Sequence, residues 1–502
     1  MPGNSHDVII VGGGSAGAVL AARLSQDPQR EVLLLEAGPA YPPAGYPRTI
    51  KDSSLLGAHT GSDWGYVSEP GFIGHPIAAF RGKVLGGSSA VNGAVAMRAL
   101  PSDFARWADR GLKGWSFSEV LPDYLTLESA TGGDDQWHGR TGPLPIRQLT
   151  RDELSPMQQA FIDAALACGI PATADFNGAA PAGVAPYQMN VVDGTRVNTG
   201  LAYLGDEARA RPNLQILADT LVDAVLFDGT RATAVRLADG TTLHAGEVIL
   251  SAGVYGSAAV LLRSGVGPAA DLHALGIPVL ADLPVGRRLQ DHPFYYNAYA
   301  ARPDRIGRQT PVIGTMVRTA SPLAAAGELD IHIAASHLFD PSHSPTGAGF
   351  VLAVAMVRPI STGSLTLTSR DPGRAPRIDL NLLRQPRDRQ RLLEGIRLAR
   401  RIGVTRPLAD LTDRELIPGT AAGDDAAVAQ SALATLDTYH HPTSTAPMGT
   451  EDDPAAVVDW LGAVRGVEHL RVVDAAIFPD VPSAATNLTV IMAAEHIARL
   501  AY

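Results

Sequence analysis

The stretch HDVIIVGGGSAGAVLAARLSQDPQREVLLLEAG, residues 6–38, decides the fold class of this chain. Residues 7–11 are a short run rich in Val and Ile, which is typical of a buried parallel strand. Glycines come next, and residues 18–24 have a helical composition. A second apolar run covers residues 32–35. This order of strand, turn, helix and strand predicts a Rossmann-like nucleotide-binding unit.

Three glycines and one acid in this unit have the spacing of a dinucleotide-binding motif. Gly12, Gly14 and Gly17 have the G-x-G-x-x-G spacing, and Glu36 ends the second apolar run. Gly12 permits a tight turn, Gly14 lets a pyrophosphate approach the backbone, and Gly17 lets the helix pack close to the strand. Glu36 lies about 20 residues after the glycine motif, where an acid can hold a ribose hydroxyl. The pattern predicts a dinucleotide site but does not choose between FAD and NAD.

Composition narrows the class of protein. The chain has 502 residues, so it is too long for one simple domain. Its net charge is -10. It has no cluster of Lys and Arg, which argues against nucleic acid as a partner. The one cysteine, Cys168, excludes a disulfide within the chain. No apolar run reaches the roughly 18 residues of a membrane span, and the first strand starts too early for a signal peptide. We expect a cytoplasmic enzyme, without a metal site.

The remaining pattern predicts a second structural unit. Residues 214–217, 221–227 and 232–237 are predicted to form an antiparallel meander. Alternating runs at 331–333 and 364–368 predict an antiparallel sheet separate from the nucleotide fold. Helical composition or periodicity is found at residues 18–24, 102–107, 115–127, 155–168, 257–263, 387–402 and 487–500.

Six stretches, taken together, resemble one family along essentially the whole chain. The chain is similar to the glucose–methanol–choline (GMC) flavoprotein oxidoreductases. The stretches are VIIVGGGSAGAVLAARL (8–24), RGKVLGGSSAVNG (81–93), SAGVYGSAAVLLRSGVGP (251–268), LPVGRRLQDHP (283–293), YHHPTSTAPMG (439–449) and RVVDAAIFPDVPSAATNLTVIMAAE (471–495). The resemblance, and not the glycine spacing, implies FAD as the cofactor.

The resemblance also implies an architecture. It predicts an α/β protein (α+β overall) with a Rossmann-like FAD-binding domain and a substrate domain whose antiparallel sheet is flanked by helices. The FAD-binding domain is expected from residues 1–150, 216–295 and 436–502, and the substrate domain from 151–215 and 296–435. The substrate pocket is expected around residues 310–360, which carry no motif.

The resemblance implies a set of cofactor-binding residues. These are Gly12, Gly14, Ser15, Ala16, Gly17, Glu36, Ala37, Gly87, Ser88, Asn92, Gly93, Val222, Ala252, Asp474, Ala475, Asn487 and Thr489. Some relatives attach FAD covalently through a His in the glycine-rich loop. Val91 takes that place here, so a non-covalent FAD is expected.

The same resemblance implies a catalytic base. His441, which precedes Pro442, matches the family's catalytic His, and its neighbour His440 is the competing candidate. An imidazole with a pKa of about 6.5 can accept a proton near neutrality. The family usually has a second polar residue near the substrate oxygen, and Ala485 stands there. Either His441 acts alone, or another donor substitutes, or the alignment is shifted and Asn487 serves.

The implied activity is oxidation of an alcohol to an aldehyde or ketone, with hydride transfer to flavin N5 and O2 or another acceptor reoxidising the flavin. A hydroxynitrile lyase, which shares this fold and needs no net redox change, is the main alternative. A structural FAD and a photodecarboxylase are further alternatives, against which the retained His-Pro pair argues. The chain is expected to be a monomer or a homodimer.

Overall fold

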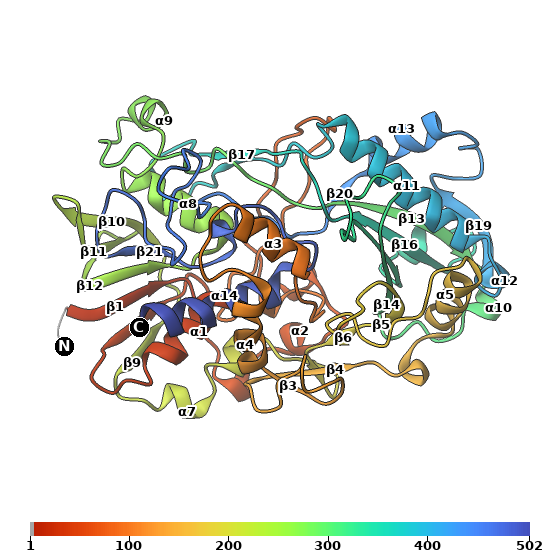
Figure 1. Ribbon diagram of the computed structural model, residues 1–502, viewed down its shortest axis with the longest axis horizontal. Coiled ribbons are helices and arrows are strands. Elements are labelled where there is room, and N and C mark those ends of the chain that lie inside the picture. The colour runs from red at the N-terminus through yellow and green to blue at the C-terminus, as the bar shows by residue number, and fades with distance from the viewer. Residues whose placement is uncertain (1–4) are drawn as a thin grey trace.

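The computed structural model describes residues 5–502 and contains two large β-sheets that lie side by side along its long axis (Figure 1). The first sheet lies at the left of Figure 1, where the two ends of the chain also lie, and the second lies at the right. The predicted class, a nucleotide-binding α/β unit with a separate antiparallel sheet, is confirmed. The residue boundaries of the predicted domain segments stay a prediction.

The first sheet is built on the stretch that opens the sequence. Its strands, in spatial order, are β10 (Val222–Asp228), β11 (Arg231–Leu237), β12 (Thr242–Leu250), β1 (Ser5–Val11), β2 (Val32–Leu35) and β9 (Leu214–Leu217), and β21 (Leu470–Val472) also pairs with β12. β1 pairs in parallel with both β12 and β2. All four residues of β2 are buried, as its continuous apolar run predicts.

One prediction about this sheet is wrong. Residues 214–217 do not belong to the antiparallel meander, because β9 pairs in parallel with β2. The meander consists of β10, β11 and β12. The edge of the buried strand β2 needs a hydrogen-bonding partner, and β9 supplies it.

Helices follow the carboxyl ends of the parallel strands. α1 (Ser15–Leu24) follows β1, and α8 (Gly253–Arg263) follows β12. α14 (Thr486–Ala501) packs beside α1 and α4 (Phe117–Leu127). Both α1 and α8 begin three to four residues earlier than predicted. Their N-termini therefore lie directly at the end of the sheet where ligands bind in open α/β folds.

The second sheet is antiparallel throughout. Its strands, in spatial order, are β19 (Thr412–Ile417), β13 (Pro293–Ala301), β16 (Gly349–Met356), β15 (Ile331–Ser336), β14 (Ile313–Thr319) and β5 (Gly183–Pro186), and β20 (Asp437–Thr438) pairs with β13. α11 (Pro386–Gly403) packs on this sheet with α5 (Pro156–Ala167) (Figure 1). The predicted run at 364–368 lies outside it, because β17 (Ser364–Thr366) pairs only with β18 (Arg377–Asp379).

Smaller elements complete the described chain. The other helices are α2 (Arg48–Lys51), α3 (Pro101–Asp109), α6 (Thr199–Ala202), α7 (Asp206–Arg209), α9 (Ala269–Ala274), α10 (Pro303–Ile306), α12 (Leu408–Leu411) and α13 (Asp425–Thr435). The other strands are β3 (Glu128–Ala130), β4 (Leu144–Gln148), β6 (Gln188–Met189), β7 (Val191–Val192) and β8 (Thr195–Arg196). Within residues 5–502, no helix combines the length and the hydropathy that crossing a bilayer requires.

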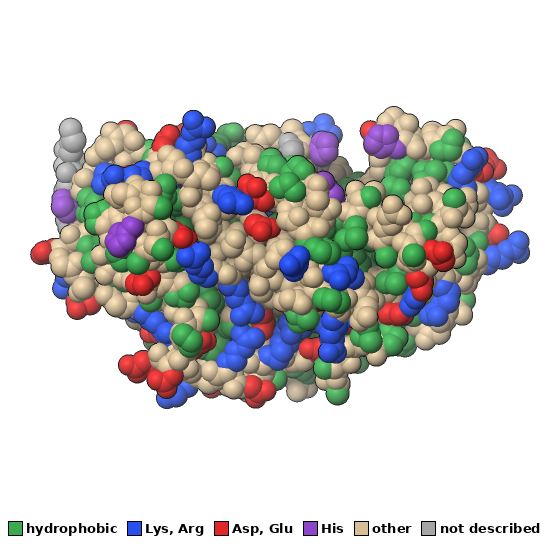
Figure 2. Space-filling view, turned by 90° about the horizontal axis from the view of Figure 1, so that it is seen from above, with side chains coloured by type: hydrophobic (Ala, Val, Ile, Leu, Met, Phe, Trp, Pro, Cys, Tyr) green, Lys and Arg blue, Asp and Glu red, His purple; other side chains and the backbone are tan. Residues whose placement is uncertain are grey.

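The surface carries charges of both signs. In the face that Figure 2 shows, acidic side chains are scattered and several Lys and Arg side chains are grouped in the lower middle. Apolar side chains are dispersed between them. The net charge of -10 is therefore not concentrated as one acidic patch on this face.

Candidate active site

A cavity of about 730 Å³ is lined by residues of both large sheets. Most of the predicted site residues line it. They are Gly12, Gly14, Ser15, Ala16, Glu36, Ala37, Gly87, Ser88, Asn92, Gly93, Val222, Ala252, His441, Asp474, Ala475, Ala485 and Asn487. One continuous space therefore reaches from the glycine turn after β1 to the loop that carries His441.

Two predicted cofactor residues do not line the cavity. A Cβ at Gly17 would collide with the carbonyl oxygen of Gly12, so Gly17 serves the close packing of helix on strand. Thr489 is fully buried, and its hydroxyl lies 2.8 Å from the hydroxyl of Tyr124 on α4. Thr489 therefore ties α14 to α4 rather than contacting a ligand in this cavity.

Two glycines of the turn after β1 differ in the space around them. Gly12 has a φ of +99°, and a Cβ there would meet the backbone of Ser251. At Gly14 the nearest atom to an added Cβ is 3.7 Å away, an ordinary contact, and its φ is -80°. Protein packing thus requires glycine at Gly12 but not at Gly14, where a closely approaching ligand explains it. α1 has no side-chain cap, so its first N–H groups are available to an anion.

Glu36 lines the cavity and also holds the glycine turn. Its carboxylate accepts hydrogen bonds from the N–H of Gly13 at 2.9 Å and of Gly38 at 2.8 Å. The side chain is 5% exposed, and burial raises the pKa of this carboxyl although both hydrogen bonds oppose the shift. Glu36 therefore shapes the backbone at the ribose end of the cavity as well as facing it.

Two more contacts join distant segments at the cofactor end. Asp474 accepts hydrogen bonds from the hydroxyl of Ser257 at 2.6 Å and from the N–H of Gly253 at 2.9 Å, which fixes the start of α8. The hydroxyl of Ser15 donates to Oδ1 of Asn487 at 2.7 Å, which joins the starts of α1 and α14. The uncapped N-terminus of α14 lines the cavity through Ala485, Thr486 and Asn487.

His441 is paired with a second histidine. Its Nδ1 lies 3.1 Å from Nδ1 of His292, with the two rings nearly perpendicular at 85°. A neutral imidazole carries one ring proton. When that proton lies on Nδ1 of His441, it is donated to His292, and Nε2 of His441 is free to accept another. Burial, and then the proximity of His292 and Arg81, holds the pKa of His441 well below its usual range. His441 is therefore neutral at physiological pH.

Asp291 holds the backbone around His441. Its buried carboxylate accepts hydrogen bonds from the N–H of His441 at 2.8 Å, from the N–H of His292 at 2.8 Å and from the hydroxyl of Thr438 at 2.6 Å. The hydroxyl oxygen of Thr438 in turn accepts the N–H of His440 at 2.9 Å. Burial raises the pKa of Asp291 to about 6, although these bonds oppose the shift. One carboxylate thus organises the whole turn.

His440 has a different environment from His441. Its φ is +62°, its ring packs against Phe80, and its carbonyl oxygen accepts a hydrogen bond from Arg81 at 2.7 Å. Burial, followed by the charge of Arg81, lowers the pKa of His440 to about 3. In the described part of the chain, no carboxylate lies within 4 Å of the Arg81 guanidinium, which lines the cavity.

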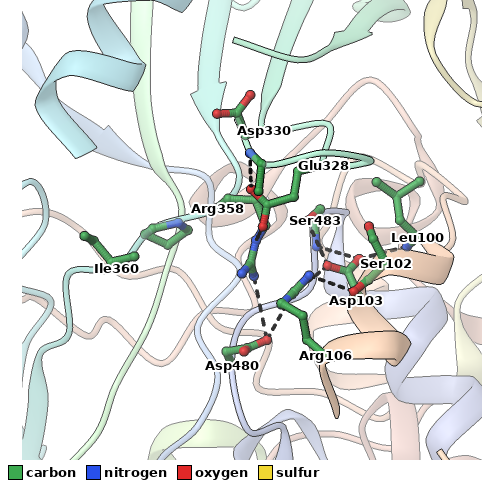
Figure 3. A network of polar contacts seen from close by, with 12 residues as sticks. Leu100, Ser102, Asp103, Arg106, Glu328, Asp330, Arg358, Ile360, Asp480 and Ser483 are labelled. Carbon is green, nitrogen blue, oxygen red and sulfur yellow. Dashed lines mark hydrogen bonds and ion pairs between the residues drawn. The ribbon is translucent and has the colours of Figure 1, made fainter. Parts of the chain in front are cut away.

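The loop before α14, which carries Ala485, is anchored by a network of buried charges (Figure 3). Asp103 on α3 accepts hydrogen bonds from the N–H of Ser483 at 3.0 Å and from its hydroxyl at 2.8 Å. Asp480 accepts from Arg106 at 3.1 Å and lies 3.7 Å from Arg358, which follows β16. Figure 3 shows Arg358 between Asp480 and Glu328. The loop is thus fixed to the second sheet and to α3 at once.

Comparison with known proteins identifies the family. Two family models, both described as GMC oxidoreductase, match residues 6–294 and 359–494. The chain belongs to the GMC oxidoreductase family. The 5-(hydroxymethyl)furfural oxidase of Methylovorus sp. (strain MP688) is 37% identical over 98% of this chain and 98% of that protein. The oxygen-dependent choline dehydrogenase of Vibrio vulnificus (strain YJ016) is 34% identical over 99% of this chain and 94% of that protein.

A solved structure agrees with the sequence relatives. Pyridoxine 4-oxidase from Mesorbium loti has a TM-score of 0.90 at 34% identity, covering 98% of each chain. This GMC oxidoreductase is an FAD-dependent enzyme that oxidises the CH–OH group of an alcohol. The relatives named here are oxidases and dehydrogenases, so they give the lyase alternative no support.

The residues of this GMC oxidoreductase fit FAD. The glycine Gly14, which packing does not require, and the uncapped start of α1 suit a pyrophosphate. Glu36 lies at the ribose end, and the uncapped start of α14 suits the electron-rich pyrimidine edge of a flavin. The cavity joins these features to His441.

Three functional residues were not predicted. Asp291 and His292 lie in the motif LPVGRRLQDHP, which was recognised but given no role, and Arg81 opens the motif RGKVLGGSSAVNG. The adjacent acid and His in LPVGRRLQDHP were the available signal. The pocket around residues 310–360 contributes Ile313, Ala334, Ser336, Val351 and Ala353, and β13 adds Phe294, Tyr296 and Ala298.

Proposed function

We propose that His441 is the base that accepts the hydroxyl proton of the alcohol. The contact between the Nδ1 atoms of His441 and His292 carries this proposal, because it leaves Nε2 of a neutral, cavity-lining imidazole to take the proton. His440, with its carbonyl held by Arg81 and its ring against Phe80, has a structural role.

In the proposed reaction the alcohol loses its O–H proton to Nε2 of His441 and a hydride from the carbon that bears the hydroxyl, and a C=O bond forms. FAD, when bound, is the hydride acceptor. Asp291 keeps the turn of residues 438–441 in place. Nδ1 of His292 accepts a hydrogen bond from Nδ1–H of His441, and His292 stays neutral because burial lowers its pKa to about 3. The chain's own contribution is position and proton transfer.

We assign FAD binding to residues that line one end of the cavity, which we call the cofactor end. They are the lining residues of the glycine turn, Glu36, the loop Gly87–Gly93, Asp474, Ala475 and Asn487. FAD is held without a covalent bond, since Val91, a cavity-lining valine, offers no nucleophile. Acid precipitation of the purified yellow protein should leave free FAD in the supernatant. Flavin that stays with the precipitate would overturn this assignment.

O2 or another acceptor takes the electrons from the reduced flavin. The names of two relatives, an oxidase and an oxygen-dependent dehydrogenase, support O2. Hydrogen peroxide formed in air with substrate supports O2, and turnover only with an artificial acceptor supports the alternative. The cytoplasmic location and the monomeric or homodimeric state stay predictions.

Anaerobic addition of a panel of alcohols, followed by the flavin absorbance, tests the proposed function. At least one alcohol should bleach the flavin and yield its aldehyde or ketone. A bound flavin that no alcohol bleaches, with cleavage of cyanohydrins instead, would make the protein a lyase.

A further inference from the structure

One face of the second sheet forms the wall of the cavity near His441. Side chains alternate between the two faces of a strand. Tyr296 and Ala298 on β13, Ala334 and Ser336 on β15, and Val351 and Ala353 on β16 all line the cavity. Each pair is two residues apart, so the wall is continuous across three neighbouring strands.

The centre of this wall is low and flat. Ala353 is paired directly with Ala334 on one side and with Tyr296 on the other. Val351 is paired with Ala298 and with Ser336. Ala334 and Ala353 are therefore direct neighbours, and Ala298 lies diagonally across from Ala353, beside Val351. Small side chains thus form a shallow strip across the wall.

Aromatic rings border the strip. Phe294 is stacked on Tyr439, with ring centroids 4.3 Å apart and an angle of 11° between the planes. Tyr296 packs edge-on against Phe294 at 5.0 Å. All three residues line the cavity. A flat strip beside aromatic rings suits a planar ring, which can stack or make edge-to-face contacts there.

The same wall carries no charge. Histidines aside, the charged residues among those described that line the cavity are Glu36, Arg81, Arg263, Asp340, Arg374 and Asp474. Glu36 and Asp474 lie at the cofactor end, and Asp340 and Arg374 are exposed. Arg263 is paired with Asp223. Of these lining charges, Arg81, whose guanidinium donates to the carbonyl of His440, is the one close to the catalytic turn, and it is positive. The carboxylate of Asp291, which holds the turn, does not line the cavity.

We propose that the substrate is an alcohol whose CH–OH group is carried on a flat, neutral aromatic ring, and that cationic alcohols such as choline are discriminated against. This rests on the proposed function. The aryl alcohol would lose its hydroxyl proton to His441 and a hydride from the carbon that bears the hydroxyl, with FAD as the hydride acceptor when bound, and it would leave as the aryl aldehyde or ketone. A quaternary ammonium group would gain cation–π contacts with the bordering rings, but it would also meet the positive charge of Arg81 and no cavity-lining carboxylate near the catalytic turn to pair with.

Two matched pairs of compounds test the charge and the shape separately. 3,3-Dimethylbutan-1-ol has the shape of choline with carbon in place of nitrogen. With the FAD-loaded enzyme under anaerobic conditions, the ratio of its flavin-reduction rate constant to its Kd should exceed that of choline at least 10-fold. Benzamide should bind at least 5-fold more tightly than cyclohexanecarboxamide, as measured by perturbation of the flavin spectrum, which is independent of how easily a hydride leaves.

The outcomes separate the two proposals. Flavin reduction by choline as fast as by its neutral analogue, or equal binding of the two amides, overturns the substrate class alone. No flavin reduction by these alcohols or by benzyl alcohol overturns the proposed function and the substrate class with it.

Ser336 offers a variant that reverses the charge preference. Ser336→Asp places a carboxylate in the wall, and Ser336→Asn is its neutral control of the same size. The ratio of choline to 3,3-dimethylbutan-1-ol in kcat/KM should rise at least 10-fold in the Asp variant relative to the Asn variant, at equal FAD content and melting temperature. An unchanged ratio overturns the charge argument. If either variant fails to fold, the two matched pairs on the unaltered enzyme still decide.

Discussion

Nδ1 of His292 and Nδ1 of His441 lie 3.1 Å apart, although the residues are 149 positions apart in the chain. This contact engages Nδ1 of His441 and leaves Nε2 as the ring nitrogen for the proposed proton transfer. Asp291, which directly precedes His292, accepts a hydrogen bond from the N–H of His441. Two consecutive residues of one motif therefore orient the ring and the backbone of the residue that we propose as the base.

Replacing His441 tests the base directly. His441→Ala should bind FAD normally and reduce it with substrate about 10²–10⁴-fold more slowly, because the hydroxyl proton loses its acceptor. His440→Ala is the control and should cost far less. Stopped-flow absorbance of the flavin measures both, and the opposite ranking would assign the base to His440.

Protonation of Asp291 should set the pH below which kcat/KM declines. Its pKa is about 6, whereas His441 and His292 stay neutral well below that, so Asp291 is the first of the three to take up a proton as the pH falls. Protonation removes a lone pair that holds the catalytic turn, and kcat/KM should decline below about pH 6.

Asp291→Asn keeps an oxygen for the N–H of His441 but cannot titrate. The variant should lose about 10–100-fold in kcat/KM and no longer show the decline near pH 6. Thr438→Val, which removes one of the hydrogen bonds to Asp291, is the control and should keep the decline but shift it to higher pH, because that bond lowers the pKa of Asp291. An acid limb unchanged in the Asn variant would mean that another group titrates.

Ala485 and Asn487 should separate into substrate and cofactor roles. Ala485→Asn is expected to change turnover or substrate choice, because it adds an amide where the cavity wall has only a methyl group. Asn487→Ala is expected to weaken FAD binding, because Asn487 accepts from Ser15 at the start of α1. Activity lost in the FAD-loaded Asn487 variant, with a silent Ala485 variant, would instead make Asn487 the donor to substrate.

Glu36 should matter for FAD affinity and not for chemistry. Glu36→Ala removes the acceptor for Gly13 and Gly38 together with the proposed ribose contact, and a charge-assisted hydrogen bond is worth about 1–3 kcal/mol. The Kd for FAD should rise about 10-fold or more, with kcat of the loaded fraction nearly unchanged. Glu36→Gln should be milder, and the exposed Glu31→Ala is the surface control. FAD titration of the apoprotein measures all three, and an unchanged Kd in the Ala variant removes Glu36 from the site.

His138 should make the folded protein less stable at alkaline pH. Burial alone would lower its pKa, but hydrogen bonds to Asp175 at 2.7 Å and to Glu128 at 2.9 Å outweigh burial and raise it to about 9. The folded pKa is above the unfolded value of about 6.5. The contribution is therefore full below pH 6.5 and is lost as the pH rises through 9.

The matching variant is His138→Gln, with the exposed His273→Gln as control. The free energy of unfolding should differ between His138→Gln and the unaltered protein by on the order of 1–3 kcal/mol near pH 6, and the difference should shrink toward pH 10. A difference that does not change with pH would show that His138 is not charged in the folded protein.

Local patterns account for what the sequence could predict. The continuous apolar run of β1, the glycines after it and the helix α1 are neighbours in the chain, and their spacing reflects contacts between neighbours. A Cβ at Gly12 or Gly17 would collide with nearby backbone, so these two glycines were readable from the motif. The prediction of His441 as the base came from its motif, because the residues around it are contiguous. The helix periods at α11 and α14 were predicted to within one residue at each end.

Pairing between distant segments was decided only by the tertiary structure. Residues 214–217 alternate like a hairpin strand, yet they cover the edge of β2, because an unpaired strand edge in a buried sheet costs more than a longer connection. Thr489 matched a cofactor motif but turns its hydroxyl to Tyr124 on α4. The flat alanine strip arises from the register of β13, β15 and β16, and the pairing of His292 with His441 arises from two loops that meet. The sequence by itself determined the nucleotide-binding unit and the family, whereas the tertiary structure decided which side chains meet in the cavity, because those contacts depend on strand register and loop packing rather than on spacing along the chain.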